Sequence, residues 1–137
     1  HSIAVAYYSY YLSWYFHLNF RERELVRGAL LHDYFLYDWH NSGEGHTFHA
    51  FTHARDAFVN AQKEFELSRI EREVIKKHMF PLTPVPPLCR EGLMVCLVDK
   101  GCSLYETFKQ NPYPMLRKKF LSSLPLTEPS DDFSSDR

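Results

Sequence analysis

The sequence predicts an all-α fold, and three observations support this prediction. Apolar residues recur at helical spacing along almost the whole chain, capping signals and prolines divide this pattern into segments, and no segment is a convincing strand candidate. A chain of 137 residues is long enough for one domain with its own core. We therefore expect a compact bundle of five core helices followed by a short C-terminal helix.

The first helix is expected over residues 1–17, where aromatic side chains occupy both sides of the predicted helix. One side carries Tyr8, Tyr11 and Tyr15, and another carries Tyr7, Tyr10 and Trp14. A helix that is apolar all round is typically buried on two sides. We expect one side to face either a partner subunit, in a homodimer, or a segment upstream of His1, since the sequence does not begin with Met.

The second helix is expected to begin after Asn19, because Asn19 and Glu22 resemble a capping box. Its apolar face consists of Leu25, Val26, Ala29 and Leu30. The same helix carries His32 and Asp33 near its end, where polar side chains follow an apolar stretch.

A long loop is predicted over residues 39–51, because this segment contains Gly43 and Gly45 among other turn-forming residues. Thr52 is then expected to cap a third helix, which runs from His53 to Phe65.

Ser68 and Glu71 form a better capping box, which predicts a fourth helix that reaches His78. Helix is excluded next by Pro81, Pro84, Pro86 and Pro87. The fifth helix is expected over residues 89–108.

Pro112 and Pro114 end the fifth helix, and residues 115–121 form a short basic amphipathic segment. We expect the domain to span residues 1–121. Residues 122–137 are rich in Ser, Pro and Asp, which predicts a disordered tail.

Two carboxylates follow apolar runs in which a charged group is not expected. Residues 93–98 lead into Asp99, and residues 29–31 lead into His32 and Asp33. A buried, unpaired carboxylate would cost several kcal/mol, so each of these groups needs a cation or strong hydrogen-bond donors.

Three further histidines lie near the ends of other predicted helices. His1 opens the first helix, His53 opens the third and His78 closes the fourth. Converging helix ends inside a bundle are common places for metal sites. One shared metal site would therefore satisfy these imidazoles and the buried carboxylates together.

A histidine, a His-Asp pair and a later aspartate, in this order and on helices, resemble the H…HD…D signature of the HD superfamily of metal-dependent phosphohydrolases. The residues are His1, His32, Asp33 and Asp99. His53 and His78 match the extra histidines of its two-metal members, and the resemblance covers about residues 1–108. Ala54 stands where those members often have Pro, but Ala is a good helix former.

The resemblance implies a binuclear metal site. One ion would be held by His1, His32, Asp33 and Asp99. Asp33 would bridge to a second ion held by His53 and His78, with His49, one turn before His53, as the alternative ligand. Nitrogen and oxygen ligands without a thiolate suit Mn²⁺, Fe, Zn²⁺, Co²⁺ or Ni²⁺, and suit Mg²⁺ less well.

Paired metal ions activate water for attack on phosphorus. A water shared between two cations loses a proton near neutral pH, and the resulting hydroxide would cleave a phosphomonoester or phosphodiester, with nucleotide-like molecules as the leading substrate class. This chemistry makes Asp33 a catalytic candidate as well as a ligand. The candidates to neutralise the phosphate are Lys77, Lys100 and Arg55, and Asp38 with His40 are candidates for a general acid or a partner of a ligand.

Net charge, the length of the apolar runs and the cysteine spacing restrict the classes of binding partner and the location that we expect. A net charge of −1 gives no strong nucleic-acid signal but allows a small phosphorylated substrate. No apolar run is long enough to span a membrane. The three cysteines lack metal-ligand spacing, which favours core thiols in a reducing cytoplasm.

Several alternatives stay open at this point. His78 alone is also typical of a hydrogen-bonded core histidine, and Asp33 alone could pair with Arg27. At the level of function, the alternatives to a phosphohydrolase are a di-iron oxygenase of the HD superfamily and a non-catalytic helical module.

Overall fold

The structure is a computed structural model, which describes residues 1–34, 46–109 and 112–123, without the side chains of residues 46–51. Its helices are α1 (Ser2–Tyr15), α2 (Glu22–Leu31), α3 (His46–Glu64), α4 (Arg69–Lys77), α5 (Arg90–Phe108) and α6 (Pro114–Ser123). No strand occurs within these residues, so the all-helical prediction is confirmed.

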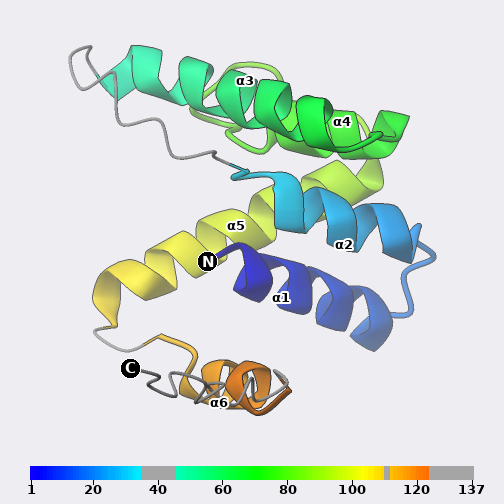
Figure 1. Cartoon of the computed structure of the whole chain (residues 1–137), viewed down its shortest axis with the longest axis vertical. Coiled ribbons are helices and arrows are strands. Elements are labelled where there is room, and N and C mark those ends of the chain that lie inside the picture. The colour runs from blue at the N-terminus through cyan, green and yellow to red at the C-terminus, as the bar shows by residue number, and fades with distance from the viewer. Residues whose placement is uncertain (35–45, 110–111, 124–137) are drawn as a thin grey trace, which may run out of the picture.

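The longest apolar helix, α5, crosses the middle of the bundle (Figure 1). It packs against α1, α2 and α4, while α1 also lies beside α2, and α3 lies beside α4. At the other end of the molecule, α6 is attached through Tyr113 and Leu116, which pack against the core.

The core consists of two clusters with many small side chains. The first joins α1, α2, α4 and α5 through Val5, Leu25, Val74 and Val95, among others, and the second joins α2, α3 and α4. Gly28 favours the close approach of α2 to α4, because a Cβ atom there would lie 3.1 Å from the Val74 side chain, closer than most Cβ contacts. These close contacts bring the ends of α2 and α4 together.

The predictions for α4 and α5 are confirmed. The Ser68 hydroxyl accepts a hydrogen bond from the Glu71 backbone N–H, and the Glu71 carboxylate accepts one from the Ser68 N–H. Glu71 also pairs with Arg27 at 3.0 Å, so Arg27 is engaged there and not with Asp33. The capping box therefore fixes where α4 begins, and with it the position of His78 at the other end.

Two predicted helix starts are wrong. The N-cap of α2 is Arg21, and no side chain caps this helix, so the capping box at Asn19 does not form. α3 begins at His46, and Thr52 lies inside it, because no helix-breaking residue follows Gly45. The predicted loop thus shrinks, and what remains of it, residues 39–45, lies outside the described residues. At the other end, α6 reaches Ser123, so residues 122 and 123 are helical and do not belong to the tail predicted over 122–137; the rest of that tail, 124–137, lies outside the described residues.

Within the described residues, α1 packs against α2 and α5 through a buried face that carries the small residues Ala4, Val5, Ala6, Ser9 and Ser13. Its large aromatic side chains, Tyr7, Tyr10, Tyr11, Trp14 and Tyr15, are exposed. Burial of this second side against a partner subunit, in a homodimer, or against a segment upstream of His1 stays a prediction. No helix in the described part of the chain combines the length and apolarity needed to cross a membrane.

Candidate metal centre

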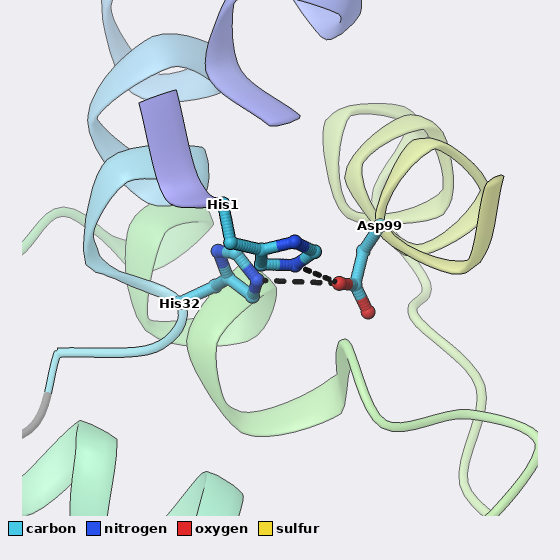
Figure 2. A group of neighbouring side chains, drawn as sticks. All are labelled: His1, His32 and Asp99. Carbon is cyan, nitrogen blue, oxygen red and sulfur yellow. Dashed lines mark hydrogen bonds and ion pairs between the residues drawn. The ribbon is translucent and has the colours of Figure 1, made fainter. Parts of the chain in front are cut away.

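The predicted ligands come from five helices and meet at one place. His1 precedes α1, His32 and Asp33 follow α2, His53 lies in α3, His78 follows α4, and Asp99 lies in the middle of α5. Figure 2 shows the rings of His1 and His32 directed at the same carboxylate oxygen of Asp99. Residues up to 98 positions apart in the sequence thus share one site.

The two most buried imidazoles each present an unsatisfied nitrogen. Nδ1 of His32 lies 2.7 Å from the Ala29 carbonyl oxygen, and Nδ1 of His78 lies 2.7 Å from that of Ile75. Because a carbonyl oxygen can only accept, both Nδ1 atoms carry the hydrogen, and in the neutral ring Nε2 carries the lone pair. Both Nε2 atoms are buried and make no hydrogen bond with the described residues. A buried polar atom of this kind needs a partner, and a metal ion would supply it.

The two carboxylate oxygens of Asp33 face different pairs of imidazoles. Oδ2 lies 3.3 Å from Nε2 of His32 and 3.9 Å from Nε2 of His1. Oδ1 lies 2.8 Å from Nε2 of His53 and 3.5 Å from Nε2 of His78. Asp33 is therefore arranged as a bridge between two positions, each with its own histidines.

Asp99 closes the position beside His1 and His32. Its Oδ1 lies 2.8 Å from Nε2 of His1 and 3.4 Å from Nε2 of His32. Its Oδ2 accepts a hydrogen bond from Lys100, whose ammonium also donates to the His78 carbonyl at 2.9 Å. Lys100 thus orients Asp99 and ties α5 to the end of α4, which is a different role from the predicted contact with a phosphate.

These distances fit ligands that share an ion. Ligand atoms about 2.1 Å from one ion, at angles of about 90–109°, lie about 3.0–3.4 Å from each other. The nitrogen–oxygen distances around Asp33 and Asp99 run from 2.8 to 3.9 Å, so each position needs shifts of only a few tenths of an ångström. The donors are imidazole nitrogens and carboxylate oxygens without a thiolate, which suits borderline transition metals.

The charges at the site shift one another's pKa values. Burial lowers the pKa of His32, but the adjacent Asp33 and Asp99 carboxylates outweigh burial and raise it to about 9. Burial raises the pKa of Asp33 and of Asp99, but the surrounding imidazoles hold both carboxyls far below their usual range. Without a metal, protons on imidazoles balance the carboxylates. A metal ion would compete with those protons for Nε2.

Two predicted phosphate-binding cations do not lie at the centre. Lys77 pairs with Glu73 at 3.5 Å, and Glu73 in turn accepts from the backbone of Cys89. Arg55 is exposed, and two residues along a helix place it nearly opposite to His53. Sequence proximity to a ligand therefore did not predict proximity in space.

Three other predicted residues cannot be placed. Asp38 and His40 lie outside the described residues, as does the side chain of His49. His53 lies in α3, as predicted, and its Nε2 atom contacts Asp33.

The sequence prediction missed several residues beside His1. Glu106 contacts Nδ1 of His1 at 2.9 Å. A cavity of about 550 Å³ adjoins the same ring and is lined by His1, Glu106, Lys109, Tyr113, Arg117 and Phe120, among others. Glu106 follows Asp99 by seven residues, two helical turns, and this spacing was a signal that could have found it. Lys109, the C-cap of α5, and Arg117 on α6 carried no such signal, because only the fold brings these two positions to the same cavity as His1.

A comparison of the chain with models of protein families, with curated proteins and with solved structures gave no match. The resemblance to the HD superfamily therefore stays a prediction, which rests on the signature residues.

Proposed function

We propose that this protein is a metal-dependent phosphohydrolase of the HD type, which cleaves a phosphomonoester or phosphodiester with nucleotide-like substrates as the leading class. One observation carries the proposal: the buried Nε2 atoms of His32 and His78 make no hydrogen bond with the described residues, and they lie 3.3 and 3.5 Å from the two oxygens of Asp33. Hydrogen-bonded core histidines would have partners for both ring nitrogens. A site for one or two divalent transition-metal ions explains why these nitrogens lack them.

The proposal gives each residue of the site a specific role. His1, His32 and Asp99 would hold one ion, His53 and His78 a second, and Asp33 would contact both. When bound, the metal supplies Lewis acidity, which lowers the pKa of water and stabilises charge on phosphoryl oxygens. Asp33 and Asp99 keep their charge at neutral pH because their pKa values are depressed. The backbone carbonyls of Ala29 and Ile75 hold His32 and His78 in the tautomer that a ligand needs.

The substrate would meet different cations from those predicted. Lys109 and Arg117 line the cavity that adjoins His1, and its apolar wall includes Phe120. A phosphate ester with an apolar or planar group fits this lining, because ligand cavities are mostly apolar with a few charged groups. Lys109 and Arg117 replace Lys77 and Arg55 in the proposal.

The test is metal content and phosphate release by the purified chain. We expect Mn²⁺-, Co²⁺- or Zn²⁺-dependent release of phosphate or a nucleotide from a panel of phosphoesters, and Asp33→Ala should abolish it and reduce bound metal. Glu64→Ala is the matched control, because Glu64 is an exposed carboxylate at the last residue of α3, eleven residues after His53. A metal-loaded wild-type chain that cleaves no member of a broad panel contradicts the proposal.

The same experiment separates the alternatives. Phosphate release with Mn²⁺ under argon excludes an oxygenase that requires a di-iron pair and O₂. Absence of bound metal, with a melting temperature that His32→Ala leaves unchanged, would instead indicate a non-catalytic helical module. A cytoplasmic location belongs to the proposal too, and it is supported by the three free cysteines.

A further inference from the structure

Three of the four imidazoles around Asp99 and Asp33, those of His1, His32 and His78, contact a second group through Nδ1, and they do so in two different ways. His32 and His78 each donate from Nδ1 to a carbonyl three residues earlier in their own helical turn. His1 instead directs Nδ1 at the Glu106 carboxylate, with distances of 3.0 and 2.9 Å to its two oxygens. His1 is thus the only one of these three rings whose second nitrogen contacts a charged group.

The position of His1 in the fold explains this difference. His1 is the N-cap of α1, so no carbonyl of α1 precedes it. Its side chain is also 25% exposed, whereas those of His32 and His78 are 0% and 1% exposed. Because Nδ1 of His1 has no carbonyl of its own helix as a partner, another element is needed to fix the orientation of this ring.

α5 supplies that second contact. Glu106 lies seven residues after Asp99, so both carboxylates project from nearly the same face of α5. Asp99 contacts Nε2 of His1 while Glu106 contacts Nδ1. The ring is therefore held at both nitrogens by one helix.

We propose that Glu106 is a positioning residue, which acts through His1 to fix the direction of its Nε2 atom toward the metal. This inference rests on the proposed function, because it requires that His1 be a ligand. Glu106 contacts Nδ1 of His1, whereas the candidate ion position lies at Nε2 of the same ring beside Asp99, so Glu106 is placed to support His1 and not to bind that ion directly. A carboxylate on the second nitrogen of a ligand histidine fixes the tautomer and increases the basicity of the ring.

The inference predicts a specific pattern of metal affinities. Titration of the metal-free full chain with Co²⁺, followed by calorimetry and by the visible absorption of the bound ion, should show about 10–100-fold weaker binding for Glu106→Ala. Glu106→Gln should fall between this variant and the wild type, because its carboxamide oxygen still accepts a hydrogen bond. His1→Ala should weaken binding at least as much as Glu106→Ala.

The double variant decides between positioning and simple charge attraction. If Glu106 acts through His1, adding Glu106→Ala to His1→Ala weakens binding no further. Glu64→Gln is the control for a lost negative charge, because Glu64 is exposed at the far end of α3, and it should leave Co²⁺ affinity unchanged. Circular dichroism of each variant checks that the helices are intact.

The outcomes distinguish failure of this inference from failure of the proposed function. The role of Glu106 alone is overturned if folded Glu106→Ala binds Co²⁺ as tightly as the wild type. It is also overturned if the double variant loses affinity by the product of the two single fold-changes. A wild-type chain that binds no Co²⁺, Mn²⁺ or Zn²⁺ overturns the proposed function, and the inference with it.

Discussion

The two sides of Asp33 differ in the candidate ligands that the chain places beside them. Beside Oδ2 lie two imidazoles, from His1 and His32, and a second carboxylate, from Asp99, which Lys100 orients. Beside Oδ1 lie His53 and His78, and within the described residues no second carboxylate corresponds to Asp99 there. The Oδ2 side thus offers one anionic group more than the Oδ1 side. We infer that the Oδ2 side would bind its ion more tightly.

The largest expected effect is a loss of metal affinity on the Oδ2 side that does not occur on the Oδ1 side. Asp99→Ala removes the carboxylate that closes the Oδ2 side, and we expect metal affinity there to fall by more than about 100-fold. His53→Ala should weaken only the second, looser position and leave one tight ion per chain. Metal content after dialysis, measured by mass spectrometry, and calorimetric titration report both results. Loss of all bound metal in His53→Ala would show that the two positions are not independent.

A smaller effect comes from the protonation of His32. In the metal-free protein its pKa is about 9, against 6.5 for an ordinary histidine. A raised pKa stabilises the fold fully below pH 6.5, and this contribution disappears as the pH rises through about 9. The loss amounts to roughly 3 kcal/mol, or roughly 10 °C in melting temperature.

Bound metal should remove the pH dependence of stability that comes from His32, because the ion takes the place of the proton on Nε2. We therefore expect the melting temperature of the metal-free chain to fall between pH 6.5 and about 9, while that of the metal-loaded chain stays level. Metal affinity should rise over the same range. A metal-free chain whose melting temperature is constant across this range would show that the carboxylates do not hold a proton on His32.

The smallest effect concerns the substrate, and it tests whether the cavity beside His1 serves the reaction. Arg117→Ala should raise KM about tenfold with little change in kcat, because it removes a contact to the phosphate that binds the substrate and the transition state about equally. Steady-state kinetics on the best phosphoester of the panel measures this. Arg23→Ala, an exposed position on α2, is the matched control. An unchanged KM in Arg117→Ala would remove the cavity from the proposed function.

Local signals in the sequence were enough for part of the fold. The capping box at Ser68 and the long apolar pattern before Phe108 predicted α4 and α5, because caps and periodicity act within a few residues. The start of α3 was predicted too late, because it depends on contacts that are distant in the sequence. The residues after Gly45 are compatible with loop or helix, and packing against α4 is not visible in a local pattern.

The candidate metal ligands, which the structure brings together, could be named from the sequence because a charged or imidazole side chain at the end of an apolar run is costly without a partner. The groups that form hydrogen bonds and ion pairs at the site could not be paired correctly from the sequence. Lys100 follows Asp99 and turns back to it, Lys77 points to Glu73, and Glu106 reaches His1 across 105 positions. Which groups lie within 3 Å of one another depends on how α1, α2, α4 and α5 cross, and those crossings are set by close packing of small residues such as Gly28 and not by the polar residues themselves.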